Sequence, residues 1–357
     1  MVRARAPYME WAKSRPVPAI DLATSNLLAC ALADLPGARE AVDLAGSSPE
    51  GWPPLVEAIA SRYGVGPESV ATAVGCSGAN FLALASLVES GDEVLFEQPG
   101  YDPLAAAATM LGARVTRFER RFDEGWRLDP DRIERALTPR TRLVMLSSPH
   151  NPSGVLAGGD ALREIGRLAE RHGVTVISDE VYLDLAAAGH PPAAKLSPAF
   201  VSTNSLTKAY GLASLRCGWA LASRELTGRI RRARDVVDVW SPMPSDRISV
   251  VAFQNLDRLK ERARGLVKKN AGLVAGFLAR RPELECVPSD ATIAFPRFAD
   301  GRNSGPFAER LLRDRGVAVV PGAFFDSPSH FRVSFGGDTA PLEKGLEGID
   351  ACLDQPS

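Results

Sequence analysis

From about residue 70 to residue 177, short apolar runs alternate with segments of helical periodicity, and this alternation constrains the fold more than any other feature. Strands joined by helical crossovers form a mainly parallel sheet that is covered on both faces. The sequence therefore predicts an α/β fold, with ligands bound at the carboxyl ends of the strands. The expected strands are 70–74, 93–96, 113–118, 142–146 and 174–177, and the expected helices are 79–90, 103–111, 132–137 and 161–171.

The chain has 357 residues, which is too long for one small domain and fits about two. The Pro-rich segment 241–245 interrupts the alternation and indicates a hinge between domains. A long helical stretch is expected at 247–280, followed by further strands and helices up to residue 353. We therefore predict a large domain over 49–245 and a small domain made of residues 1–48 and 246–357.

Composition excludes several classes of protein. The formal net charge of −1 argues against nucleic-acid binding, and no apolar run approaches the length of about 20 residues that a membrane span requires. The N-terminus has no apolar segment typical of a signal peptide. The five cysteines and four histidines lack metal-ligand spacing, so we expect reduced thiols, a cytoplasmic protein and no metal.

Lys208 follows a polar strand end, Ser202–Thr203–Asn204, and is surrounded by small residues. A lysine held in this way can form a Schiff base with a carbonyl compound. Arg216, eight residues later, suits an anion such as a phosphate. The alternative is a surface loop with an ordinary lysine and arginine.

Other polar or glycine-rich segments follow the expected strands. In the turn from Gly75 to Asn80, small residues would let backbone N–H groups approach a phosphate, although strand-to-helix turns are often glycine-rich for structural reasons. Tyr101 could stack on a flat cofactor or pack on the next helix. Asn151 lies between turn-forming residues and could donate a hydrogen bond from a rigid loop, whereas His150 is expected to be a packing residue.

Two further charged residues belong to strands. Asp179 leaves an apolar strand and needs a partner, such as a protonated pyridine nitrogen, that Tyr182 could also reach. The adjacent Glu180 is expected to be structural. Arg332 lies within the strand 331–335 and suits two-pronged binding of a carboxylate, with a structural salt bridge as the alternative.

The order and spacing of these residues resemble the fold type I pyridoxal-phosphate (PLP) enzymes, specifically the class I/II aminotransferases similar to aspartate aminotransferase. The resemblance extends from about Ile20 to Phe335 and rests on Asn151-Pro152-Ser153-Gly154, Asp179 with Tyr182, Ser205 and Lys208 with Arg216, and Arg332. It implies a large domain with a mainly parallel sheet of the seven-stranded type and a smaller α/β domain.

The resemblance also implies a role for each matching residue. Lys208 would form the Schiff base and then move the proton, Asp179 would keep the pyridine nitrogen protonated, and Tyr101 would stack on the ring. Asn151 and Tyr182 would hydrogen-bond the phenolic oxygen, and Arg332 would bind the substrate α-carboxylate with Asn151 and Ser25 nearby. The phosphate would be held by Ser77, Gly78, Ala79, Ser205 and Arg216.

The sequence departs from the family pattern at two places. Family members usually carry a tyrosine, which reaches the partner subunit's cofactor phosphate, where this chain has Gly46. Ser25-Asn26 replaces a glycine that many members have near the substrate. These differences put the cross-subunit phosphate contact in doubt and leave recognition of the substrate side chain open.

We therefore expect a cytoplasmic, homodimeric, PLP-dependent aminotransferase that acts on an amino acid and a 2-oxo acid. The alternative within the same fold is a lyase, decarboxylase or oxidase, including enzymes of the histidinol-phosphate or threonine-phosphate type. A transcription regulator with a PLP-type domain would need a preceding DNA-binding domain, and only about 20 residues precede the short strand that we expect at 19–22.

Overall fold

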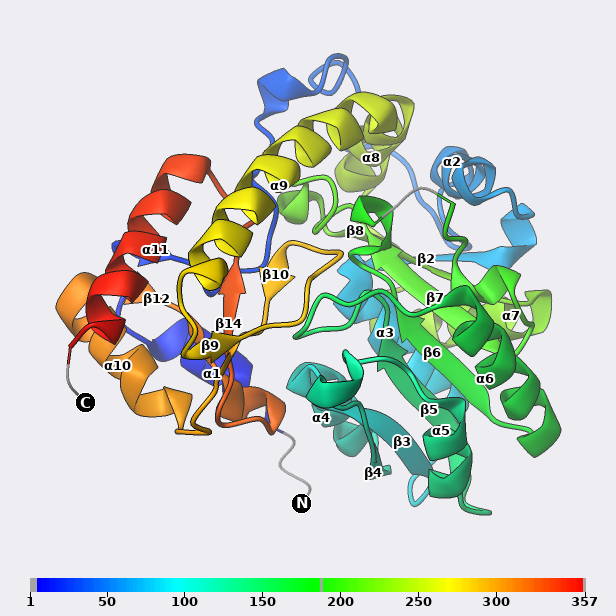
Figure 1. The fold of residues 1–357 in the computed structure, drawn as a ribbon. Helices are drawn as coiled ribbons and strands as arrows, with labels where there is room; N and C mark the ends of the chain where they lie inside the picture. The colour runs from blue at the N-terminus through cyan, green and yellow to red at the C-terminus, as the bar shows by residue number, and fades with distance from the viewer. Residues whose placement is uncertain (1–4, 187–188, 356–357) are drawn as a thin grey trace.

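The computed structural model describes residues 5–186 and 189–355 and contains a central seven-stranded sheet (Figure 1). The order of its strands is β2-β8-β7-β6-β5-β3-β4, and only β8 runs antiparallel to its neighbours. The strands are β2 (Val70–Val74), β3 (Glu93–Gln98), β4 (Arg114–Glu119), β5 (Thr141–Ser147), β6 (Thr175–Asp179), β7 (Phe200–Ser205) and β8 (Cys217–Leu221). The predicted α/β fold with a mainly parallel sheet is confirmed.

Alternate residues of the central strands pack into two separate cores, because successive side chains of a strand point to opposite faces. Leu143 and Met145 of β5 pack with α3, α4 and α7, whereas Val144 and Leu146 pack with α5 and α6. The sheet is therefore covered on both faces. These helices and their neighbour α2 are α2 (Pro53–Tyr63), α3 (Gly75–Leu87), α4 (Asp102–Met110), α5 (Pro130–Ala136), α6 (Gly159–His172) and α7 (Arg224–Val237).

Several predicted boundaries differ from those in the structure. The predicted loop 75–80 is the beginning of α3, because Gly75 has a φ of +71° and turns the chain from β2 directly into the helix. The predicted helix 247–280 is two helices, α8 (Met243–Gln254) and α9 (Leu256–Ala279), which meet at Asn255. Strand β8 and helix α7 were not predicted.

The C-terminal part of the chain forms smaller sheets that lie apart from the central one, with α9 reaching from one part to the other (Figure 1). Here β1 (Ile20–Asp21) of the N-terminal arm pairs in parallel with β12 (Val317–Ala318). The other elements are β9 (Leu284–Glu285), β10 (Ile293–Ala294), β11 (Arg297–Phe298), α10 (Ser304–Arg315), β13 (Val320–Pro321), β14 (Phe331–Ser334) and α11 (Thr339–Leu353).

The division into a domain over 49–245 and a domain of 1–48 with 246–357 stays a prediction. The pairing of β1 with β12 supports it, because it joins the N-terminal arm to the C-terminal part. However, Ala252 of α8 and Leu256 and Leu259 of α9 pack in the same cluster as α2 and β8. The helices after the hinge therefore begin against the central sheet.

No helix in the described ranges is both long and apolar enough to cross a membrane.

Candidate active site

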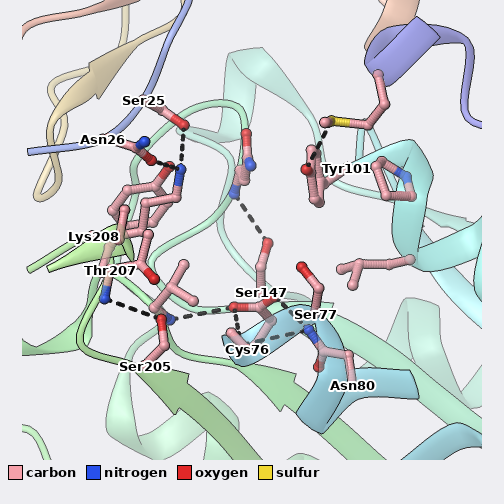
Figure 2. Close-up of a pocket in the computed structure, with 18 of the residues that line it drawn as sticks. Ser25, Asn26, Cys76, Ser77, Asn80, Tyr101, Ser147, Ser205, Thr207 and Lys208 are labelled. Atoms are coloured by element: carbon pink, nitrogen blue, oxygen red, sulfur yellow. Dashed lines mark hydrogen bonds between the residues drawn. The ribbon is translucent and has the colours of Figure 1, made fainter. Parts of the chain in front are cut away.

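A cavity of about 320 Å³ lies at the carboxyl ends of the parallel strands and at the start of α3 (Figure 2). Its walls come from segments that are far apart in the sequence, including the arm at residues 24–26, the ends of β5, β6 and β7, and the loop that follows β7. Nine of the predicted site residues line it: Ser25, Ser77, Tyr101, Asn151, Asp179, Tyr182, Ser205, Lys208 and Arg216.

Lys208 reaches this cavity from the loop after β7. Its Nζ donates hydrogen bonds to Oγ of Ser25 at 3.0 Å and to Oδ1 of Asn26 at 2.7 Å (Figure 2). Burial, reinforced by the positive charge of Arg332, lowers the pKa of Lys208 to about 7. Much of the amine is therefore neutral near physiological pH, which is the form that attacks a carbonyl.

Asp179 is the last residue of β6, is buried and also lines the cavity. Its Oδ2 accepts a 2.8 Å hydrogen bond from Nδ2 of Asn80, and its Oδ1 accepts a longer one from the backbone N–H of Val181 at 3.3 Å. Burial raises its pKa, and these hydrogen bonds oppose that effect. A buried carboxylate with this environment favours a cationic ligand.

Asn80 is a site residue to which sequence reasoning assigned no role. Its Oδ1 accepts a 2.7 Å hydrogen bond from Oγ1 of Thr203, so its amide nitrogen is directed at Asp179. The sequence signal was an amide directly before the apolar run Phe81–Ala85 of α3, because a buried amide needs a hydrogen-bond partner.

Arg216 and the first turn of α3 form a concave, positively polarised surface. A Cβ placed on Gly75 would overlap Nη2 of Arg216, so the glycine leaves room for the guanidinium against the helix start. Ser77 lines the cavity there, and the N-terminus of a helix favours an anion. Gly78 and Ala79 also belong to this end of α3, but the Ala79 side chain faces the core, so only its backbone could contact a ligand.

Tyr182 and Tyr101 both line the cavity, but their hydroxyl groups differ in hydrogen bonding. Tyr182 is 1% exposed, and its hydroxyl has no hydrogen-bond partner among the described residues. Burial raises the pKa of Tyr182 to about 12, so it remains a hydrogen-bond donor. Tyr101 follows β3, and its hydroxyl donates to Sδ of Met9 at 3.5 Å (Figure 2).

Arg332 lies fully buried in β14 and does not itself line the cavity. Its Nη1 donates to Oδ1 of Asn151 at 2.8 Å, and its Nη2 donates to the Tyr8 hydroxyl at 2.8 Å and to the Ala23 carbonyl at 3.0 Å. Its Nε is buried with no hydrogen-bond partner among the described residues. Arg332 thus contacts the cavity through Asn151 and Tyr8, which do line it.

Helix α1 (Pro7–Ser14) closes one side of the cavity and was not predicted. Tyr8 and Met9 of this helix line the cavity. Tyr8 of this helix is buried against Tyr101, Phe324 and Phe325. These contacts are all long-range, so local sequence gave no signal for them.

The remaining expectations concern residues outside the cavity. His150 is buried, with Nε2 2.9 Å from the Pro99 carbonyl oxygen and Nδ1 2.7 Å from Oγ of Ser153, which fits a packing role. Glu180 accepts hydrogen bonds from the Ala193 backbone N–H and from Ser202, which fits a structural role. Gly46 is not among the residues that line the cavity, and its φ of +119° would strain a tyrosine.

Comparison with known proteins adds independent information. A family model described as "Aminotransferase class I and II" matches residues 23–349. The chain is 33% identical over 301 residues to capreomycidine synthase of Streptomyces vinaceus, covering 83% of this chain and 77% of that protein. It is 29% identical to the aspartate/prephenate aminotransferase of Thermus thermophilus, covering 84% of this chain and 80% of that protein. The solved structure of a PLP-dependent aminotransferase from Streptococcus suis matches with a TM-score of 0.93 and 26% identity, covering 100% of both chains.

Proposed function

Because the chain belongs to the class I and II aminotransferases and has their fold type I architecture, we propose that it binds PLP in this cavity and uses Lys208 to transfer an amino group from an amino acid to a 2-oxo acid. The observation that carries this proposal is the convergence of three groups on one cavity. They are the Lys208 amine, the buried Asp179 carboxylate, and Arg216 at the start of α3. Bound PLP would supply the electron sink that stabilises a carbanion at the substrate Cα.

The residues present fit this cofactor at three points. The first turn of α3, with Ser77, Ser205 and Arg216, would hold the phosphate. Asp179, held by Asn80, would pair with the ring nitrogen. The unpartnered hydroxyl of Tyr182 and the amide of Asn151 would hydrogen-bond the phenolic oxygen, which gives the buried hydroxyl the partner that it lacks.

The substrate would be handled by Lys208 and Arg332. A lysine whose pKa is lowered to about 7 is partly neutral near pH 7 and can accept the proton from the substrate Cα and return it to another atom nearby. Arg332, with Asn151, would bind the α-carboxylate and so orient the Cα–H bond toward Lys208. The relatives named as aminotransferases favour this reaction over a lyase, decarboxylase or oxidase.

Two experiments test this proposal. One identifies the reaction products, and the other identifies the lysine that binds the cofactor. An amino acid and a 2-oxo acid should exchange their amino group without steady release of ammonia or carbon dioxide. Borohydride should fix the cofactor to the wild-type protein but not to Lys208→Ala. Lys195→Ala is the matched control, because Nζ of Lys195 donates to the Tyr63 carbonyl at 2.9 Å and does not line the cavity. Fixation to Lys208→Ala, or steady release of ammonia, would overturn the assignment.

We also propose that the protein is a cytoplasmic homodimer. Val236 and Leu44 are 87% and 83% exposed, and Trp240 is 45% exposed, so an apolar surface is available. Residues 236–240 lie a few positions before α8, which begins at Met243. Arg247 of α8 donates a 3.1 Å hydrogen bond to the carbonyl of Ala45, the neighbour of Leu44. The exposed apolar residues at 236–240 and Leu44 therefore both lie next to α8. The free state of all five cysteines supports a reducing compartment.

A further inference from the structure

We propose that this cavity selects an amino acid with an uncharged, largely apolar side chain, which would lie between α1 and α4; this inference rests on the proposed aminotransferase function. The wall in question, here called the α1–α4 wall, is made of apolar residues from both helices. Its members are Met9 and Ala12 of α1 and Pro103, Leu104 and Ala107 of α4.

Three contacts fix α1 against the start of α4. The backbone N–H of Tyr8 donates to Oδ2 of Asp102 at 3.1 Å, and the rings of Tyr8 and Tyr101 lie 5.7 Å apart, edge to face. The Tyr101 hydroxyl meets Sδ of Met9 at 3.5 Å (Figure 2). The α1–α4 wall is therefore a built part of the cavity whose two sides are held in register.

The α1–α4 wall also lies close to the group proposed to hold the substrate. Tyr8 and Tyr101 both line the cavity, and the Tyr8 hydroxyl accepts a hydrogen bond from Arg332. A substrate whose carboxylate reaches the Arg332 and Asn151 pair would therefore present its side chain near α1. The small side chains of Ala12 and Ala107 leave space there for a side chain longer than a methyl group.

Charge determines which side chains this space accepts. Among the described residues that line the cavity, the charged ones are Asp179, Lys208 and Arg216, and each is proposed to contact the cofactor. A second carboxylate on the substrate would lose its hydration against the α1–α4 wall without gaining a cation there. A basic side chain would find only Asp179, which Asn80 already holds.

The first experiment compares substrates and dead-end ligands of the holoenzyme. The value of kcat/KM for leucine, methionine or phenylalanine should exceed that for aspartate, glutamate and lysine by roughly tenfold or more. Isocaproate should likewise bind more tightly than glutarate in a competition assay. Preferred turnover of aspartate or glutamate would overturn the inference and leave the proposed function intact. If no amino acid is converted, the proposed function fails. The relative affinities of isocaproate and glutarate would then still show whether the α1–α4 wall favours an apolar or a charged ligand.

The second experiment places a cation in the wall. Ala107→Lys should shift the ratio of isocaproate to glutarate affinity toward glutarate by about tenfold or more, because the new ammonium would meet the second carboxylate. Ala106→Lys is the matched control, since the neighbouring residue lines a separate surface pocket and should leave the ratio unchanged. Met9→Lys tests the opposite side of the wall and replaces Ala107→Lys if that variant does not fold. An unchanged ratio in a folded wall variant would overturn the inference.

Discussion

Nη1 of Arg332 donates a 2.8 Å hydrogen bond to Oδ1 of Asn151, a residue that lies 181 positions earlier in the chain. The bond joins β14 of the C-terminal part to the loop after β5 of the central sheet. It fixes the side-chain amide of Asn151 so that its oxygen faces Arg332 and its nitrogen is left for a ligand. This one hydrogen bond therefore positions both Arg332, which is proposed to bind the substrate carboxylate, and Asn151, which is proposed to bind the cofactor.

Arg332→Lys should raise KM for every amino-acid substrate by about 10- to 100-fold. A lysine keeps the charge but loses the planar pair of donors that binds a carboxylate at two points. Steady-state kinetics on several amino acids would measure the effect. Arg297→Lys is the control, because Arg297 pairs with Glu285 and Asp123 near the surface. An unchanged KM would identify Arg332 as part of a structural network only.

Asp179→Ala should lower kcat by about 100-fold or more, equivalent to roughly 2.7 kcal/mol of transition-state stabilisation. The variant removes the carboxylate proposed to keep the cofactor ring nitrogen protonated. Turnover near the wild-type rate, measured with saturating PLP, would rule out this role.

Asn80→Ala tests a positioning role for Asn80 through the pH profile. The hydrogen bond from Asn80 lowers the pKa of Asp179, so its loss should raise that pKa. Because Asp179 must be ionised, the acid limb of the activity profile should move to higher pH, with a decrease in kcat of about tenfold. A decrease in kcat without a shift of the acid limb would point to a packing defect.

The apoprotein should capture aldehydes through Lys208 with a midpoint near pH 7. Burial and Arg332 lower the pKa of this lysine from its usual 10.5 to about 7, and only the neutral amine reacts. The rate should therefore rise from about pH 5 and reach a plateau by about pH 9. Mass spectrometry after reductive trapping would measure it. Arg332→Met should move the midpoint upward, and a wild-type midpoint above about 9 would contradict the prediction.

Gly75→Ala should weaken PLP binding by at least about tenfold. The new Cβ would overlap Nη2 of Arg216 and displace that cation from the start of α3. Gly173→Ala is the control, because Gly173 has a similar φ of +64° but no atom within 4 Å of its Cβ. Both variants strain the backbone. Equal PLP affinities, measured by equilibrium titration, would exclude a phosphate role for this turn.

Val236→Asp should shift the protein from dimer to monomer, because it places a charge in the exposed apolar surface proposed as the subunit interface. Light scattering after size-exclusion chromatography would measure the mass. Val17→Asp is the control, since Val17 is 95% exposed on the N-terminal arm and away from this surface in sequence. A wild-type monomer would contradict the proposal.

The sequence by itself determined strands β2 to β6 of the central sheet and nine of the residues that line the cavity. Alternating runs predicted β2 to β6 to within a few residues, because a parallel sheet buried on both faces requires continuous apolar segments. Asp179 could be predicted because it ends an apolar strand, and Lys208, Asn151 and Tyr182 because they lie in the loops that directly follow β7, β5 and β6. Parallel strands bring such ends together on one edge of the sheet.

Tertiary structure alone decided what surrounds those residues. Tyr8 and Asn26 come from an arm without a local apolar pattern, and their contacts with Arg332 and Lys208 join residues 324 and 182 positions apart. Strand β8 was missed because its identity depends on pairing with β2 and β7 rather than on its own periodicity. The continuous helix expected at 247–280 is interrupted at Asn255, between α8 and α9. Local propensity cannot encode such contacts, because their free energy arises only when distant segments are brought together.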